Sequence, residues 1–571
     1  MILFSLKKRL SLPITSWQLC LLASIGGALS AMLIVGFTMA TTALQELYLS
    51  EKDNYNSISE LSRFLLPIFG AIVILLVSWI TGYKYLRTGI PFVLHRLKVA
   101  HGVIPLRNTI HQFIGSAIAL ASGFSVGREG PAIHLGAAFS GYLGSFLKLP
   151  HNSIRTLSAC GIAAAISASF NTPVAAVIFV MEVILREYKV HIFIPIMMAS
   201  LVGSMITTSV LGPAHEFEYF QTIVLELEHF PVLILFAIAI GVLSFGFNKY
   251  LVATIKHSEK YHIVSRLMLA ALITSLLSYV VPQALGTNFG AIDFSISDNP
   301  SLFFLMGLLI AKLIMTISAL GLGIPGGAIG PILGIGAIAG SCTAVFIQSY
   351  YPDVYLTSDF ALMGMAGMMA ATLNAPLAAL ITVVELSNQL EVIMPAMIII
   401  GTSCIVSGQF LGNRSLFVMQ LEIQNLIYRK PPLEKSLQRV GVLGVMNENF
   451  EIINQLSEQQ KIEHLSQLEE KHFLLEQVND DESTSGVYYS IHNEVTESSE
   501  SHTNNQADNS IKLTQQLLLP LHAQATLMEV YSLLEKKRKG AVYIYGDNMD
   551  DVLGIITFAQ VRRFLVEGNI N

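Results

Sequence analysis

Long apolar stretches fill the chain up to about residue 430 and then stop. They cluster at 15–48, 63–83, 110–148, 155–211, 229–253, 263–285, 300–348 and 358–411. A membrane-spanning helix needs about 20 mainly apolar residues, so these clusters hold one span and several of them hold two. The pattern predicts an all-α polytopic membrane protein. Its first apolar run is too long for a removable signal peptide and is expected to be a retained span.

The distribution of charged residues predicts how these spans are oriented. Lys7, Lys8 and Arg9 precede the first span, the loop from Lys84 to Arg107 is basic, and the turn between them carries Glu51 and Asp53. Basic loops face the cytoplasm by the positive-inside rule. We therefore expect residues 1–14 to be a cytoplasmic N-terminus and the first two spans to run out and back.

The last part of the chain has a different pattern and predicts a folded cytoplasmic tail over 430–571. Residues 493–511 are rich in Glu, Ser, Asn and Thr and are predicted to be a disordered linker. After them the pattern predicts a helix over 527–534, strands over 541–545 and 552–556, and a helix over 559–565. This order predicts a small α/β domain.

Composition supports the membrane assignment and removes several function classes. Hydrophobic residues make up 53% of the chain and charged residues 13%, with a mean hydropathy of +0.58. A chain this apolar does not form a water-soluble globule. The net charge of -6 shows no basic bias, so nucleic acid is not an expected partner. No metal-ligand or nucleotide-binding motif is present, and neither a metal nor a catalytic cofactor is expected.

The membrane part contains an internal repeat. The segment 170–182 recurs at 373–385 with seven of thirteen positions identical, and both copies share an Asn-x-Pro start and a final Glu, at Glu182 and Glu385. Two related halves broken by Gly and Pro are typical of transporters whose site lies between discontinuous helices. We expect repeats at about 60–215 and 225–425. Their matching glutamates are interpreted as helix-anchoring acids.

Four short motifs look like helix starts within the membrane. They are Arg87-Thr88-Gly89-Ile90-Pro91, Gly127-Arg128-Glu129-Gly130-Pro131, Gly327-Ala328-Ile329-Gly330-Pro331 and the segment 412–417. The second and third match at an offset of 200, so the breaks belong to the repeat. Free N–H groups and the helix dipole at such ends favour an anion. The alternative is that Gly and Pro merely kink packed helices.

Glu129 is the residue most suited to a gate. A carboxylate within apolar spans is costly and marks a functional site. At a helix start it can occupy an anion site when ionised and leave that site when protonated. The alternative is a structural salt bridge with Arg128, which is otherwise an electrostatic attractor.

Ser125 offers a remote alternative from another class. Residues 123–127 match the GxSxG pattern of serine hydrolases, which would make the chain an intramembrane hydrolase. That motif works on a strand-to-helix turn, and Ser125 instead lies in a predicted helix hairpin. We therefore do not expect an enzyme.

Taken together, these motifs resemble the CLC family of chloride channels and chloride/proton exchangers over residues 15–425. GREGP and the two Asn-x-Pro segments carry the resemblance. It implies an inverted-repeat bundle with broken helices, a homodimer in a bacterial inner membrane, and one pathway for chloride or a similar halide per subunit. It also implies Glu129 as the gating glutamate. The implied anion contacts are Thr88, Arg128, Gly130, Ala328, Ile329, Gly330 and Phe417.

The chain departs from the family pattern where proton coupling is decided. Exchangers carry a second glutamate after the position of Glu182, and this chain has Val183. Ile329 replaces an aromatic residue, and Phe417 replaces a tyrosine that would donate a hydrogen bond. We therefore favour passive or weakly coupled chloride conduction. Proton-coupled antiport stays an alternative, with protons reaching Glu129 through water or another acid such as Glu187.

The tail resembles the paired CBS regulatory domains of many family members. The second unit, 519–567, is recognisable, and the first, 436–492, is degenerate. Gln560 stands where nucleotide-binding versions usually have an aspartate, so adenosine nucleotide binding is doubtful and a structural role is an equal alternative. A third interpretation makes the protein a sensor that signals through its tail.

Overall fold

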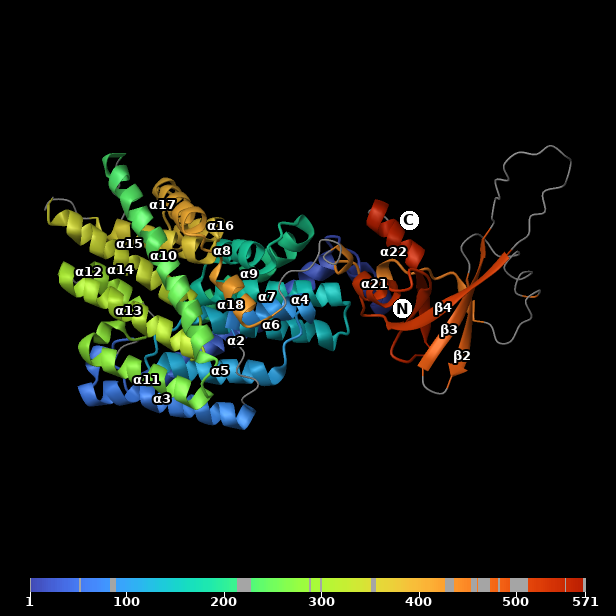
Figure 1. Cartoon of the computed structure of the whole chain (residues 1–571), viewed down its shortest axis with the longest axis horizontal. Coiled ribbons are helices and arrows are strands. Elements are labelled where there is room, and N and C mark those ends of the chain that lie inside the picture. Colours follow the sequence, from blue (N-terminus) through green and yellow to red (C-terminus); the bar gives the residue numbers. More distant parts are fainter. Residues whose placement is uncertain are drawn as a thin grey trace. The chain divides into compact units, whose positions relative to one another are not determined.

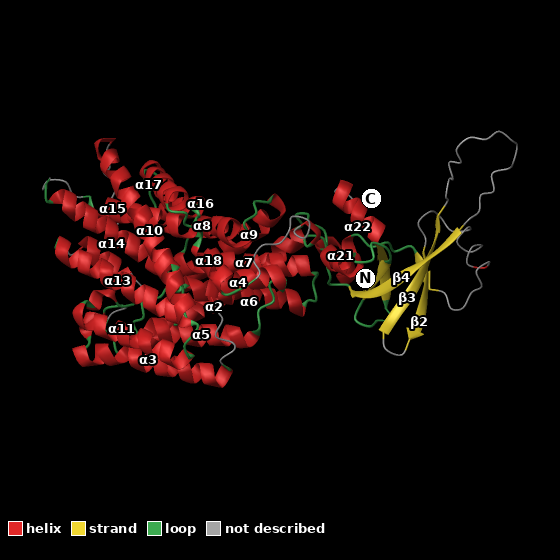
Figure 2. Cartoon of the chain, viewed as in Figure 1, coloured by secondary structure: helices red, strands yellow, loops and turns green. Residues whose placement is uncertain are grey.

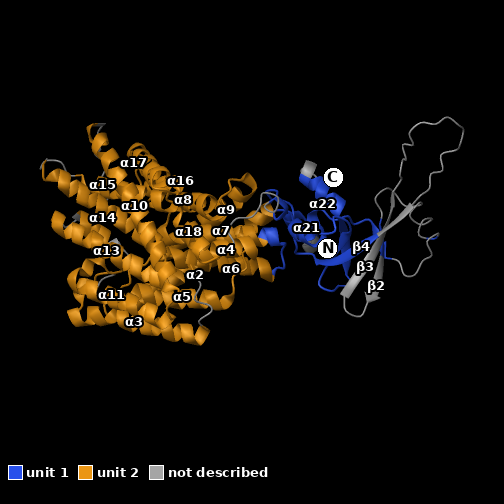
Figure 3. Cartoon of the chain, in the orientation of Figure 1, with its two compact units in different colours: residues 1–16, 147–153, 429–571 blue, residues 17–146, 154–428 orange. Residues whose placement is uncertain are grey.

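The chain folds into two compact units (Figure 3). The membrane unit comprises Trp17–Phe146 and Ile154–Tyr428, and the tail unit comprises Met1–Ser16, Leu147–Ser153 and Arg429–Asn571. The computed structural model describes residues 2–50, 53–82, 89–212, 227–286, 289–297, 300–350, 356–426, 436–452, 460, 473–480, 483–492, 512–549 and 551–567. Arg87, Thr88 and the linker predicted at 493–511 lie outside these residues.

The membrane unit is built from helices, whereas the strands belong to the tail unit (Figure 2). Nine of its described helices are long and apolar enough to cross a membrane. This finding supports the predicted all-α membrane protein. The helices are α2 (Trp17–Glu46), α3 (Glu60–Thr81), α4 (Gly89–Val99), α5 (Leu106–Ala121), α6 (Glu129–Phe146), α7 (His151–Phe170), α8 (Pro173–Phe179), α9 (Val190–Leu211), α10 (Phe230–Ser258), α11 (Ile263–Val280), α12 (Phe289–Ser297), α13 (Leu302–Leu322), α14 (Ile329–Gln348), α15 (Thr357–Leu373), α16 (Pro376–Ser387), α17 (Ile393–Ile405) and α18 (Leu416–Ile423).

Close glycine contacts hold matching helix pairs together in both halves of this unit. A Cβ on Gly136 of α6 would collide with the carbonyl oxygen of Gly161 in α7. In the second half, a Cβ on Gly336 of α14 would collide with the carbonyl of Gly364 in α15. Small residues let membrane helices approach closely, where dispersion replaces the hydrophobic drive that lipid removes. The two hairpins therefore share one packing device.

The outer surface of the membrane unit is apolar. Trp79 of α3, Phe303 of α13 and Met394 of α17 are among many exposed large apolar side chains. Patches of this extent are not tolerated on soluble monomers. They suit contact with lipid tails, which agrees with the length and composition of the helices.

The tail unit centres on a six-stranded sheet (Figure 1). Its strands are β1 (Phe450–Ile452), β2 (Phe473–Asp480), β3 (Ser483–His492), β4 (Lys512–His522), β5 (Ala541–Tyr545) and β6 (Val552–Thr557), in the order β1-β2-β3-β4-β5-β6. The β1–β2 and β4–β5 pairs are parallel and the others antiparallel. Helices α21 (Leu527–Leu534) and α22 (Phe558–Glu567) complete it. The helices and strands predicted after residue 520 are confirmed. The division into two CBS units stays a prediction.

Two distant segments join the tail unit, which the sequence did not indicate. One is the N-terminal segment with helix α1 (Ile2–Leu10), predicted as a separate cytoplasmic N-terminus. The other is 147–153, which comprises the link after α6 and the first residues of α7 and is called the α6–α7 connection below. Asn152 Nδ2 donates to the carbonyl oxygens of Leu10 and Ser11 at 3.0 and 3.1 Å. The Gly441 N–H donates to the Ser11 carbonyl at 2.7 Å. The N-terminal segment therefore lies between the α6–α7 connection and the C-terminal part of this unit.

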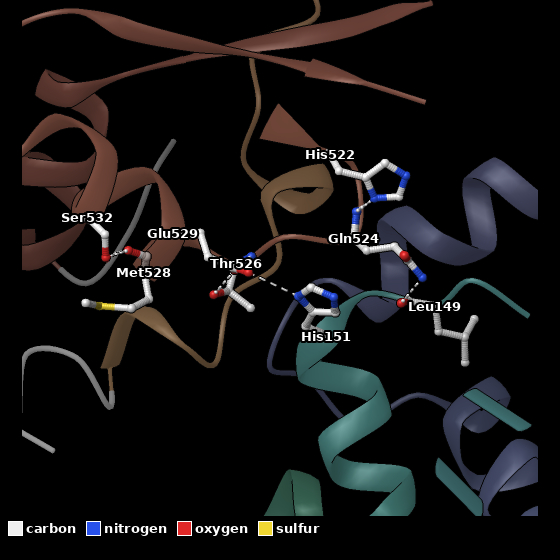
Figure 4. A network of polar contacts seen from close by, with 8 residues as sticks. All are labelled: Leu149, His151, His522, Gln524, Thr526, Met528, Glu529 and Ser532. Carbon is white, nitrogen blue, oxygen red and sulfur yellow. Dashed lines mark hydrogen bonds and ion pairs between the residues drawn. The ribbon is translucent and has the colours of Figure 1, made fainter. Parts of the chain in front are cut away.

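The α6–α7 connection also binds residues that precede and begin α21 (Figure 4). His151 N donates to the carbonyl oxygen of Gln524 at 2.8 Å, and Gln524 Nε2 donates to the carbonyl oxygen of Leu149 at 3.1 Å. Glu529 closes a capping box with Thr526 at the start of α21, and its Oε1 lies 3.2 Å from His151 Nδ1. Gln524 and Glu529 thus bind the α6–α7 connection to the C-terminal part of the tail unit.

Candidate functional site

The four predicted breaks are helix starts. Helix α4 begins at Gly89, α6 at Glu129, α14 at Ile329 and α18 at Leu416. Gly89 has a φ of +79°, a conformation that L side chains rarely adopt, so glycine is required there. The alternative that Gly and Pro merely kink continuous helices is therefore wrong at these positions.

The starts of α6 and α14 are joined by a pair of backbone hydrogen bonds. Gly127 N donates to the Gly327 carbonyl at 2.7 Å, and Gly327 N donates to the Gly127 carbonyl at the same distance. The pairing is antiparallel. Equivalent glycines of the two repeats thus contact each other. This contact brings two positively polarised helix starts together, as an anion site built from backbone requires.

The carboxylate of Glu129 lies at this junction. Its side chain is 1% exposed, and a Cβ built on Gly127 would collide with Oε2. The same Oε2 lies 3.1 Å from the position that a Cβ on Gly327 would take. A side chain at either glycine would therefore crowd the carboxylate. In this structure the carboxylate is placed where an anion would meet the two helix starts.

A cavity of about 540 Å³ meets the junction from one side. It is lined by the starts of α4, α14 and α18 through Gly89, Pro91, Gly327, Ala328 and Phe417. Three of the four predicted breaks therefore share one hollow. Glu129 and Ile329 line a separate cavity of about 20 Å³, together with Phe170, Thr172 and other apolar residues. Ala328, which lines the large cavity, and Ile329, which lines the small one, are consecutive residues directly after Gly327.

The other predicted site residues lie as follows. The Arg128 guanidinium lies over the Phe170 ring, 5.2 Å from its centroid, which suits an attractor held at the site. Gly130 lies against the α14 start, because a Cβ on it would be 2.7 Å from Gly327 Cα. Phe417 is buried and lines the large cavity. Val183 is buried in a π-helical turn, Val180–Leu185, that follows α8.

Ser125 lacks the setting of a hydrolase nucleophile. It lies between α5 and α6, and its hydroxyl is hydrogen-bonded to Thr316 Oγ1 of α13 at 2.8 Å. The GxSxG nucleophile needs a strand-to-helix turn and a histidine base. This bond instead ties the segment before Glu129 to α13.

Sequence reasoning missed several ionisable residues near the site. Glu259 and Arg266 line the large cavity, and Arg266 Nε donates to the Leu322 carbonyl at 3.2 Å. His111 of α5 and His134 of α6 are completely buried. Ionisable residues within apolar spans mark functional sites by default, which is the signal that would have found both histidines.

Comparison with known proteins supports a single family. The family described as voltage gated chloride channel matches residues 69–408. An H(+)/Cl(-) exchange transporter, ClcA, of Vibrio campbellii is 26% identical over 422 residues, covering 71% of this chain and 89% of that protein. The Citrobacter koseri ClcA is 26% identical over 433 residues, with coverage of 71% and 88%.

Solved structures share the fold. A slow cyanobacterial Cl-/H+ antiporter superposes with a TM-score of 0.64 at 19% identity, covering 72% of this chain and 98% of that chain. A eukaryotic CLC transporter superposes with a TM-score of 0.58 at 16% identity, covering 95% of this chain and 98% of that chain. These likenesses establish the inverted-repeat, broken-helix architecture that the sequence predicted.

Proposed function

The chain belongs to the voltage gated chloride channel family, and we propose that it carries chloride through the Gly127–Gly327 junction, with Glu129 as the gate. This family transports ions, and anion transport across a membrane is its activity. Chloride or a similar halide is the proposed substrate, and no enzymatic reaction is proposed.

One observation carries the role of Glu129. Its carboxylate occupies the point at which the α6 and α14 starts meet, between Gly127 and Gly327. A chloride ion and an ionised carboxylate compete for the same positive helix ends. Protonation removes the negative charge of Glu129 and weakens its hold on that place. Arg128, Gly130, Ala328, Ile329, Gly330 and Phe417 surround the proposed anion, and Thr88 is proposed as a further contact.

We extend the proposal to proton-coupled exchange. The bacterial relatives are named H(+)/Cl(-) exchange transporters, and protonation of Glu129 is what would couple the two ions. The preference for passive conduction rested on Val183, and these relatives give it no support. Passive conduction stays as the second candidate, because buried Val183 cannot relay a proton.

Reconstituted flux with simultaneous pH recording tests the proposal. Liposomes containing the full chain and loaded with chloride are placed in low-chloride medium. We expect chloride efflux together with proton movement against its own gradient. Glu129→Gln should remove proton movement and the dependence of chloride efflux on pH, because glutamine cannot ionise. Chloride efflux with an unchanged pH dependence in this variant would remove Glu129 from the gate.

The assembly and location belong to the same proposal. We propose a homodimer with one pathway per subunit, in a bacterial inner membrane with both termini in the cytoplasm. No nucleotide is needed at the tail in this scheme. Chemical cross-linking in native membranes measures the dimer, and protease access from either side measures the location of the tail. A monomer, or a tail cleaved only from outside, would contradict these points.

A further inference from the structure

Two histidines lie inside the membrane unit without a role in the proposed gate. His111 is in α5 and His134 is in α6, and both side chains are 0% exposed. The His134 ring stacks on Phe92 of α4, with centroids 5.7 Å apart and planes 9° apart. Both rings are thus fixed within packed helices.

Their ring nitrogens lack protein hydrogen bonds. Within the part of the chain that the structure describes, neither nitrogen of either ring has a hydrogen-bond partner. The neighbouring Gln112 Oε1 is likewise without a partner there. A buried polar group that makes no hydrogen bond costs about 1–3 kcal/mol. Three such side chains together are poorly explained by packing, which an apolar residue would serve better.

His111 lies beside the wall of the large cavity, and His134 lies in the helix that carries Glu129. A Cβ on Gly115 would be 3.1 Å from Pro325 and 3.8 Å from His111, so these two residues flank one point. Pro325 lines the large cavity. His134 follows Glu129 by five residues in α6, about 7.5 Å along the helix axis and about 140° around it, so the two side chains leave different faces of the helix.

Other ionisable groups lie in the helices around these histidines. Helices α2, α4, α5, α7 and α14 pack against α6, and α3 packs against α5. Among the groups in these helices, His111 acts electrostatically on His134. The others are Cys20, Glu46, Glu60, Arg63, His95, Arg96, Lys98, Arg107, His151, Arg155, Cys160 and Cys342, and α6 itself also carries Glu129 and Tyr142.

We infer that His111 and His134 pass protons between the large cavity and Glu129, replacing the acid that is absent at Val183. The inference rests on the proposed proton-coupled exchange. An imidazole accepts a proton on one ring nitrogen and releases the proton from the other, so no further reactant is consumed. The route requires water molecules that bridge the space between His134 and the carboxylate.

The test compares proton and chloride fluxes in liposomes containing the full chain. His134→Gln and His111→Gln keep hydrogen-bonding capacity but cannot titrate. In each variant we expect proton flux to fall by about a hundredfold, the lower end of what a positioned acid–base group contributes. Chloride flux should be retained. His257→Gln, at an exposed position in the last turn of α10, is the matched control and should leave both fluxes unchanged.

The outcomes separate this inference from the proposed function. Variants that keep the native ratio of protons to chloride would overturn the histidine route and leave exchange standing. Loss of both fluxes in both variants, in protein that elutes as the native oligomer, would assign the histidines to packing and also overturn the route. If one variant does not fold, the other decides. Native protein that moves chloride without protons would overturn the exchange itself.

Discussion

Glu182 and Glu385 each cap the helix that begins the matching segment of the other repeat. Glu385 Oε1 and Oε2 accept from Val174 N at 2.9 Å and Ala175 N at 2.7 Å, at the start of α8. Glu182 accepts from the N–H groups at the start of α16, with a distance of 2.6 Å from Ala378 N to Oε2. The interpretation of both residues as helix-anchoring acids is confirmed.

Removing either charge should destabilise the protein without stopping transport. Glu182→Gln or Glu385→Gln keeps one acceptor oxygen but loses the charge-assisted bonds to a helix start, which we expect to cost about 1 kcal/mol each. The apparent melting temperature in detergent should fall by about 1–2 °C. Glu391→Gln, at an exposed position, is the control. Loss of chloride flux with an unchanged melting temperature would contradict an anchoring role.

Adding one methyl group at the junction should block the pathway. In Gly127→Ala the new Cβ collides with the Glu129 carboxylate, and in Gly327→Ala it lies 2.5 Å from Gly130 N. Gly327→Ala must displace backbone, which has no flexible end to move, and Gly127→Ala must displace the Glu129 carboxylate from the junction. We expect chloride flux in liposomes to be lost in both variants.

Gly307→Ala in α13 is the control for this pair, since a Cβ there meets no atom within 4 Å. It should keep native flux. Native flux in Gly127→Ala would show that the carboxylate does not need the space between the two glycines.

Lys312 is a buried cation that connects α13 to the segment before Glu129. Its Nζ donates to the Ala284 carbonyl at 2.8 Å and the Gly286 carbonyl at 3.4 Å, and Gly286 N donates to the Gly123 carbonyl at 3.1 Å. Lys312→Met should leave these carbonyls unsatisfied, at about 1–3 kcal/mol. Thermal unfolding measures the loss, with exposed Lys256→Met as control. Equal melting temperatures for the two variants would mean that the buried bonds add nothing.

Acidification should loosen the contacts around Gln524 in the tail unit (Figure 4). Burial lowers the pKa of His522, the neighbouring His151 lowers this pKa further, and Asp547 opposes the shift. His522 Nδ1 accepts from Gln524 N at 3.3 Å, which a protonated ring cannot do. A histidine with a lowered pKa stabilises the fold above its unfolded pKa of about 6.5. That contribution is lost as the pH falls toward the folded value.

Hydrogen exchange on the full chain measures this effect. After correction for the intrinsic exchange rate, amides of residues 147–153 and 522–529 should lose protection between about pH 7.5 and about pH 5.5, on either side of the histidine pKa. His522→Gln keeps an acceptor and should remove the pH dependence. Equal loss of protection in that variant would assign the effect to another group.

Local signals made much of this structure predictable. Gly and Pro fix where α4, α6 and α14 begin, and a segment that starts with Gly412 precedes α18. The alternation and length of apolar runs locate α21, β5, β6 and α22. These features depend on residues within one or two turns of each other. Glu129 was identifiable because a carboxylate inside an apolar stretch has few structural explanations.

Contacts between residues far apart in the sequence could not be predicted, because no local pattern specifies them. The connection 147–153 belongs with the tail unit through backbone groups such as His151 N and the Leu149 carbonyl, which are present in every sequence. The matching glutamates were recognised, but their crossed partners depend on how the two repeats face each other. The role of Thr88 stays a prediction, because it lies outside the described residues.

The two backbone hydrogen bonds between Gly127 and Gly327 restrict how this transporter can move. These bonds join one half of the bundle to the other beside the Glu129 carboxylate. If either half tilted as a rigid body, as in alternating-access transporters, these two hydrogen bonds would break. We therefore expect turnover to depend on the swing of a few side chains within a stationary frame.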